Sequence, residues 1–139
     1  MKVDLDEIEI HNDKTLMDFE TICGYLSRSY WANQRPVSKI KKSIENSVCY
    51  GAFHKGKQIG FARLVTDGAT VYWLCDVFID EAYRGYGIGK KLIGTITSSE
   101  EFKDLLGVLG TRDAHGLYEQ YGFARDSERL MKRIPDFLK

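Results

Sequence analysis

Residues 83–90, with the sequence YRGYGIGK, constrain the fold of this chain more than any other segment. The three alternating glycines lie between an apolar run at 71–79 and a helical pattern of apolar residues that begins at Ile88. The order is therefore strand, glycine loop, helix. Glycine lets the main chain approach a ligand closely, and the first amides of a helix have no partner within it. Because the helix dipole also attracts anions, this segment predicts a phosphate or pyrophosphate site.

Hydrophobic periodicity and turn sequences predict the other elements. The predicted order is a strand (5–11), two helices (16–26 and 37–44), three antiparallel strands (48–54, 58–66 and 70–79), a helix (87–98), a strand (105–110), a short helix (113–121) and one or two strands within 123–134. This order predicts an α+β fold with a mixed sheet covered by helices. A chain of 139 residues fits one domain, so we expect a single domain spanning 1–139.

The composition excludes several classes of function. Lys plus Arg and Asp plus Glu both number 20, and the net charge of zero argues against a nucleic-acid partner. No apolar run reaches the roughly 18 residues that suggest a membrane span, and the acidic N-terminus lacks a signal peptide. The widely spaced Cys23, Cys49 and Cys75 predict neither a disulfide framework nor a metal site. We therefore expect a cytoplasmic protein without metal, nucleic-acid or membrane partners.

Three phosphate-binding patterns can be compared with the glycine loop. The dinucleotide pattern GxGxxG fails, because Lys90 stands at the third glycine position. The nucleoside-triphosphate loop fails twice, because Arg84 replaces its first glycine and Lys91 its Ser or Thr. The pattern Arg/Gln-x-x-Gly-x-Gly/Ala is met by Arg84, Gly87 and Gly89. A plain strand-to-helix turn would need one glycine, so three within five residues favour binding.

This third pattern resembles the coenzyme A loop of the GNAT superfamily of N-acetyltransferases. Residues 114–123 (AHGLYEQYGF) look like the superfamily segment Ala-x-x-Leu-Tyr-x-x-x-Gly-Phe, and the predicted element order agrees over nearly the whole chain. The resemblance implies a central, mostly antiparallel sheet of about six to seven strands flanked by about four helices. It also implies direct transfer of an acetyl group from acetyl-CoA to a primary amine of a small-molecule or peptide acceptor.

The same resemblance assigns the residues that bind acetyl-CoA. Main-chain groups of Val77, Phe78 and Ile79 would pair with pantetheine as an added strand, and the Val77 amide would donate to the thioester oxygen. Thr111 stands where many relatives have a pantetheine-binding asparagine, and its hydroxyl can supply one hydrogen bond. The pyrophosphate would contact the loop residues Arg84, Gly85, Tyr86, Gly87, Ile88, Gly89 and Lys90.

Tyr118 would act as the general acid that protonates the departing thiolate; the alternative is a core tyrosine on a short helix. The general base is open. Trp73 stands near the position where some relatives carry a glutamate, and Asp76 is the carboxylate within the strand. Asp76 could act as a base or contact the substrate, or it could pair with a neighbouring arginine, and a water chain could equally remove the proton. Cys75 reads as a buried apolar residue, which favours direct transfer.

The acceptor is expected between the first two helices. Tyr30, Trp31 and Arg35 could form a pocket for a small amine or for an amino acid with its carboxylate, or the aromatic residues could only fix the two helices to the sheet. Exposed sheet edges are compatible with a homodimer. Two rivals remain: a non-catalytic acyl-CoA-binding or regulatory module on the same fold, and an interaction domain without a ligand.

Overall fold

The computed structural model describes residues 2–138 and contains a five-stranded sheet in the order β1-β2-β3-β4-β5. The strands are β1 (Ile8–His11), β2 (Val48–His54), β3 (Lys57–Thr66), β4 (Val71–Ile79) and β5 (Leu106–Leu109). Neighbouring strands from β1 to β4 are antiparallel, and β5 runs parallel to β4. The sheet is therefore mixed, as the sequence predicted.

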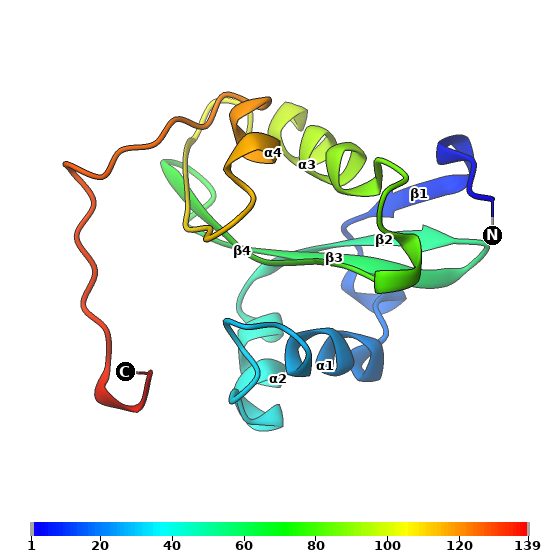
Figure 1. The fold of residues 1–139 in the computed structure, drawn as a ribbon, viewed down its shortest axis with the longest axis horizontal. Helices are drawn as coiled ribbons and strands as arrows, with labels where there is room; N and C mark the ends of the chain where they lie inside the picture. The colour runs from blue at the N-terminus through cyan, green and yellow to red at the C-terminus, as the bar shows by residue number, and fades with distance from the viewer. Residues whose placement is uncertain (1, 139) are drawn as a thin grey trace.

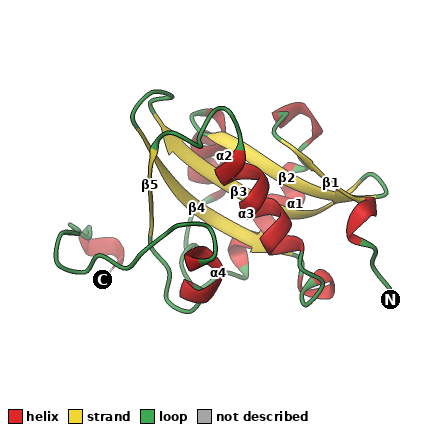
Figure 2. Cartoon of the chain, turned by 90° about the horizontal axis from the view of Figure 1, so that it is seen from above, coloured by secondary structure: helices red, strands yellow, loops and turns green. Residues whose placement is uncertain are grey.

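Four α-helices cover the two faces of this sheet (Figures 1 and 2). They are α1 (Phe19–Ser27), α2 (Val37–Glu45), α3 (Ile88–Ser98) and α4 (His115–Glu119). The helices α1 and α2 lie on one face, and α3 and α4 lie on the other (Figure 1). The predicted α+β class and helix number are confirmed.

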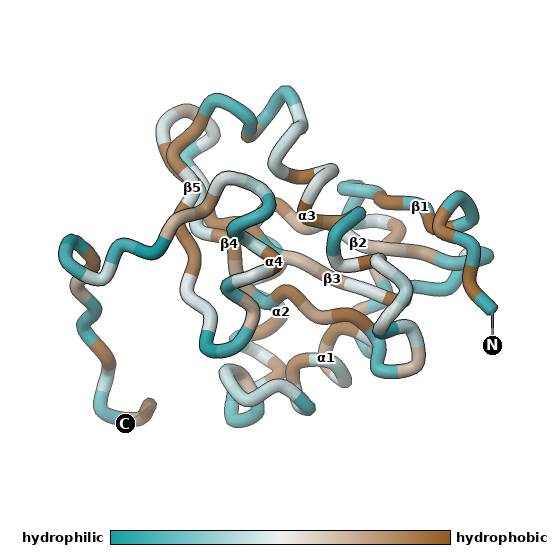
Figure 3. The backbone as a smooth tube through the Cα atoms, turned by 45° about the horizontal axis from the view of Figure 1, so that its top comes forward, coloured by the Kyte–Doolittle hydropathy of each residue, from teal (hydrophilic) through white to brown (hydrophobic). Residues whose placement is uncertain are grey.

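Each face of the sheet has its own apolar core, because side chains on a strand alternate between faces. Leu92, Ile93 and Ile96 of α3 are buried with Leu64 and Leu74 of the central strands. A second cluster joins α1 and α2 to the opposite face through, among others, the residues Ile22, Tyr25, Ile40, Phe61 and Phe78. Hydrophobic segments accordingly gather at the centre of the molecule, and outer turns are mostly hydrophilic (Figure 3).

The pairing of the strand β4 changes at its middle. Its first half, from Val71 to Leu74, pairs with the whole of β5. Within residues 2–138, the second half has no paired strand on the β5 side. The change coincides with a bulge, because the β3–β4 register shifts between Phe61 and Arg63 and Asp76 has a φ of 54°. Within residues 2–138, the region 75–79 is consequently an unpaired strand edge on the β5 side.

The prediction of one or two C-terminal strands within 123–134 is wrong. Residues 123–134 contain no strand, and the last element of the described residues is a short 3-10 helix, Asp136–Leu138, so the sheet within residues 2–138 has five strands rather than six or seven. This tail runs away from the sheet (Figure 1). Leu130 and Met131 are 45% and 92% exposed, so these apolar residues of the predicted strand region bury little surface.

Two helix starts also differ from expectation. The first helix begins at Phe19 rather than near Leu16, because the Asp18 side chain accepts a hydrogen bond from the Thr21 amide and caps it. The short helix α4 is not capped by Asp113. Instead, the Thr111 hydroxyl accepts a hydrogen bond from the Ala114 amide at 3.0 Å, just before the helix.

Candidate functional site

The glycine loop joins the free half of β4 to the start of α3. Gly85 and Gly87 have φ values of 87° and 83°, in the left-handed region that favours glycine. Gly87 is the N-cap of α3 and provides no side-chain hydrogen bond, so the first amides of the helix are left without a side-chain acceptor. A Cβ added at Gly85 would meet no atom within 4 Å, so space beside the loop is open. The predicted loop residues therefore lie around one exposed, uncapped helix N-terminus.

Arg84 fixes this loop to the end of β4. Its Nε donates to the Ile79 carbonyl at 2.9 Å, and its guanidinium carbon lies 4.8 Å from the centre of the Phe78 ring. Gly89, in the first turn of α3, sits where an added Cβ would be 3.9 Å from Ile79 and from Leu117. Loop, strand end and helix start thus form one packed corner.

The three β4 residues predicted to bind pantetheine lie directly before this corner. The Phe78 ring is buried against α1, stacked on Tyr25 with the ring centres 4.8 Å apart. Val77 and Ile79 pack toward the core on the α3 side. Because their side chains face the two cores, the main chain of 75–79 presents its unpaired edge in the direction of β5. An extended ligand can therefore be added there as a strand.

Asp76 is the most heavily engaged polar residue of the site. Its side chain is only 1% exposed. Its carboxylate accepts hydrogen bonds from Trp31 Nε1 at 2.9 Å, from Arg35 Nη1 at 2.8 Å and from Arg63 Nε at 2.8 Å. Of the alternatives that the sequence left open, pairing with arginine is therefore present in the structure.

The basicity of Asp76 is low. Burial raises the pKa of this carboxyl, but the hydrogen bonds and charges of Arg35 and Arg63 outweigh burial, so that the pKa lies below its usual value. A carboxylate with a lowered pKa and three donors on its two oxygens is a poor proton acceptor. This arrangement argues against Asp76 as the general base.

The residues predicted for the acceptor lie beside Asp76. Trp31 and Arg35 contact it directly, and the Tyr30 ring stands edge-on against Trp31 with the ring centres 4.9 Å apart. Tyr30 and Trp31 are 44% and 37% exposed, so part of each ring is open to solvent. The guanidinium carbon of Arg112 lies 3.7 Å from the centre of the Tyr30 ring, and the Arg112 amide donates to the Tyr30 hydroxyl at 3.2 Å.

Sequence reasoning missed Arg63 and Arg112. Arg63 is a charged residue inside the otherwise apolar run 59–65, a signal that could have identified it as the partner of Asp76. Its pairing with Asp76 nevertheless depends on the bulge, because the register places Arg63 opposite Cys75. Arg112 carried no comparable signal, since it lies in a loop whose path the sequence does not determine.

Tyr118 is 8% exposed and packs edge-on against Phe123 with the ring centres 6.0 Å apart. Its hydroxyl makes no hydrogen bond within residues 2–138. In the same range, every side-chain oxygen that is fully buried has a hydrogen-bond partner. The hydroxyl therefore reaches accessible space. Burial, assisted by the neighbouring Tyr30 and Asp113, raises the pKa of Tyr118 to about 12, so this hydroxyl is protonated at neutral pH.

Two further predicted residues can be placed. Thr111 uses its hydroxyl as an acceptor for the Ala114 amide, which leaves the hydroxyl proton free to donate to a ligand. Burial raises the pKa of Cys75 to about 11, so its thiol is protonated at neutral pH and is a weak nucleophile. A protonated Cys75 thiol favours direct acetyl transfer over a route through a covalent intermediate on this thiol.

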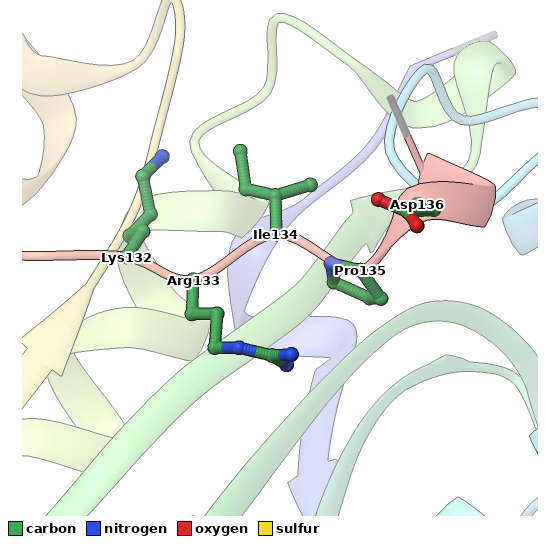
Figure 4. Close-up of a pocket in the computed structure, with 5 residues that line it drawn as sticks. All are labelled: Lys132, Arg133, Ile134, Pro135 and Asp136. Carbon is green, nitrogen blue, oxygen red and sulfur yellow. The ribbon is translucent and has the colours of Figure 1, made fainter.

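A surface hollow elsewhere does not share these features. It is lined by five consecutive residues of the tail, namely Lys132, Arg133, Ile134, Pro135 and Asp136 (Figure 4). Lys132 and Ile134 point to one side of the chain and Arg133 to the other, so their side chains do not converge (Figure 4). No predicted site residue lines it.

Within residues 2–138, no helix is both long and apolar enough to cross a membrane.

Comparison with known proteins agrees with this geometry. The sequence profile of the acetyltransferase (GNAT) domain matches residues 45–125, which is more than half of the chain. The chain therefore belongs to the GNAT acetyltransferase family. A crystal structure from Xanthomonas campestris pv. campestris, described as an acetyltransferase of this family, is 35% identical, with a TM-score of 0.87, 92% of this chain covered and 93% of that one.

Two other relatives extend the comparison. A GNAT acetyltransferase from Elizabethkingia anophelis, whose structure has acetyl-CoA bound, shares the fold at 20% identity and a TM-score of 0.66, covering 86% of this chain and 77% of that one. The uncharacterized N-acetyltransferase ycf52 of Gracilaria tenuistipitata var. liui is 29% identical over 120 residues, which is 81% of this chain. The chain spans 64% of the length of that protein, and 59% and 55% of two other curated relatives.

Replacing Asp76 by Asn should destabilise the fold, because two arginines would then lack their counter-charge. Breaking such a buried ion pair costs about 3 to 5 kcal/mol of unfolding free energy. Denaturant unfolding at pH 7 measures the difference, with Asp126→Asn in the exposed tail as the control. The pKa of Asp76 is lower in the folded chain than in the unfolded one, so its stabilisation is present above pH of about 4 and is lost below it. Equal stability of Asp76→Asn and wild type at pH 7 would contradict this role.

Proposed function

We propose that this chain transfers an acetyl group from acetyl-CoA directly to a primary amine of a small acceptor. The observation that carries the proposal is the position of the free edge of β4, which ends at an uncapped helix N-terminus bearing two left-handed glycines. An extended chain with a pyrophosphate at one end fits these two features together. The bound acetyl-CoA in the Elizabethkingia anophelis relative supports the same choice of donor.

The binding of acetyl-CoA is divided between the loop and the strand. Main-chain amides from Arg84 to Lys90 would hold the pyrophosphate, because the dipole of α3 favours negative charge there. Main-chain groups of Val77, Phe78 and Ile79 would hold pantetheine, and the Thr111 hydroxyl would donate one hydrogen bond. The open space beside Gly85 supports close approach of a ligand to this part of the main chain.

The chemistry requires a neutral amine, a polarised carbonyl and a proton for sulfur. The amine nitrogen forms a bond to the thioester carbon, and the Val77 amide stabilises the resulting oxyanion by about 3 kcal/mol. The carbon–sulfur bond then breaks, and Tyr118 gives its hydroxyl proton to the sulfur. Solvent afterwards returns a proton to Tyr118.

The pKa of Tyr118 affects the transfer of its proton to the sulfur. A pKa of about 12 keeps the Tyr118 hydroxyl protonated at neutral pH, but it also makes this hydroxyl a weak acid. Burial that raises the pKa of the hydroxyl raises that of a nearby thiolate as well, because both anions lose hydration. The difference between the two pKa values is therefore smaller than the pKa of Tyr118 alone would indicate. Because Asp76 has low basicity, we assign removal of the amine proton to water.

The alternative is a non-catalytic acyl-CoA-binding module. One observation favours it, because Asp76 is the only carboxylate of β4 and its oxygens are engaged by other residues. Thiol release from acetyl-CoA, measured with and without a panel of primary amines, separates the two. Amine-dependent release is expected. A rise in melting temperature with coenzyme A but no release would establish the module instead.

Replacing Tyr118 by Phe should lower kcat about 100-fold or more, because the general acid is lost. The dissociation constant for acetyl-CoA should change little, since the ring and its packing remain. Steady-state thiol release and calorimetric titration measure the two quantities. Tyr72→Phe is the matched control, because Tyr72 is also buried and its hydroxyl makes no hydrogen bond within the described residues. Unchanged turnover in Tyr118→Phe would remove this residue from the mechanism.

Replacing Gly85 by Ala should weaken acetyl-CoA binding about tenfold. A side chain at a φ of 87° is strained by about 1 to 2 kcal/mol, and a loop that relaxes must be strained again on binding. Gly68→Ala is the matched control, because Gly68 has a φ of 74°, has similar open space and lies in the β3–β4 turn. Titration with acetyl-CoA compares them. Equal affinities for the two variants would show that the Gly85 conformation does not matter for binding.

A further inference from the structure

The cluster around Asp76 holds more positive than negative charge. Two guanidinium groups, those of Arg35 and Arg63, share this one carboxylate. Within residues 2–138, neither arginine forms an ion pair with a second carboxylate. The side chain of Arg63 is only 13% exposed and that of Arg35 only 24%. A surplus positive charge on two largely buried guanidinium groups is costly unless an anion compensates it.

Arg35 is the arginine that can meet an external anion. Arg63 lies deeper and uses two of its nitrogens, Nε on Asp76 and Nη1 on the Ser47 hydroxyl at 3.0 Å. The Arg35 guanidinium uses only Nη1, so its other N–H groups have no acceptor in the described chain. These donors lie in a planar arrangement that suits a carboxylate.

The surface beside Arg35 extends toward Tyr118. Trp31 shares the Asp76 carboxylate with Arg35, and Tyr30 stands edge-on against Trp31. Tyr30 is in turn close enough to Tyr118 to contribute to its raised pKa. Arg112, stacked on Tyr30, has no ion pair within residues 2–138 and adds a second positive charge. The exposed rings of Tyr30 and Trp31 therefore lie between the proposed general acid and the guanidinium of Arg35, which has free donors.

From this charge surplus we infer that the acceptor is an amine that also carries a carboxylate, as an amino acid does. Arg35 binds the carboxylate, and Tyr30 and Trp31 contact the part of the acceptor between carboxylate and amine. The inference rests on the proposed acetyl transfer. It adds the class of acceptor, and it gives the second arginine of the Asp76 cluster a function that structural pairing alone does not require.

The test compares three forms of the same amine. Thiol release from acetyl-CoA is measured with several amino acids, with their carboxamides and with the amines that lack the carboxyl group. Within each set the reacting amine is retained, while the negative charge is present only in the first form. We expect kcat/KM to be at least about tenfold higher for the carboxylates, mainly through KM, because one charge-assisted contact is lost in the other forms.

Variants of Arg35 connect the preference to this residue. Arg35→Gln should abolish the preference for carboxylates, and Arg35→Lys should retain part of it, because lysine keeps the charge but not the paired donors. Arg129→Gln, which removes a charge from the exposed tail, should leave the preference unchanged. The melting temperature should fall less for Arg35→Gln than for Asp76→Asn, because Arg63 still neutralises Asp76 in the first variant.

The outcomes separate this inference from the proposed function. Acetylation of carboxamides or simple amines as efficiently as amino acids would overturn the inference and leave acetyl transfer intact. A carboxylate preference that survives in Arg35→Gln would overturn the role of Arg35. If none of the three forms released thiol while acetyl-CoA still bound, the proposed function itself would fail, and the inference with it.

Discussion

The buried ion cluster of Asp76 is the interaction on which the site depends. This residue adopts a left-handed conformation inside a strand, which is unfavourable for most residues other than glycine and is tolerated only in part by asparagine and aspartate. Its carboxylate compensates for the strain by joining the loop between α1 and α2, through Trp31 and Arg35, to β3, through Arg63. The bulge is therefore formed by the backbone conformation of Asp76 and is held by side-chain contacts of Asp76 to the α1–α2 loop on one side and to β3 on the other.

The consequence of the bulge is the division of β4 into two halves. Before it, Val71–Leu74 pairs with β5, and after it the strand edge is free. The free half leads into the glycine loop, whose conformation is held by the contact of Arg84 with the Ile79 carbonyl. The groups proposed to bind the acetyl donor and those proposed to bind the acceptor are thus held by the same few residues of β4, because Val77 follows Asp76 directly in the chain.

The sequence predicted those parts of the molecule in which local signals and tertiary packing agree. The glycine loop, the hairpins and α3 are of this kind, because turn residues and apolar periodicity determine them within a few residues. The prediction of final strands was wrong, because β-strands need a partner, and Leu130 and Met131 pair with no strand within residues 2–138. The Asp76 cluster was predicted only as one of several alternatives, since its partners lie 13, 41 and 45 residues away in sequence.

The same cluster explains why a strand carboxylate need not be the base of a transferase. A base must exchange its proton near the working pH, whereas an ion that maintains a bulge must stay charged at all times. The two arginines fulfil the second requirement and thereby prevent the first. In the proposed reaction, removal of the amine proton is therefore assigned to water. An acceptor whose carboxylate lies against Arg35 would bring its amine and its hydration water to the free edge of β4 together.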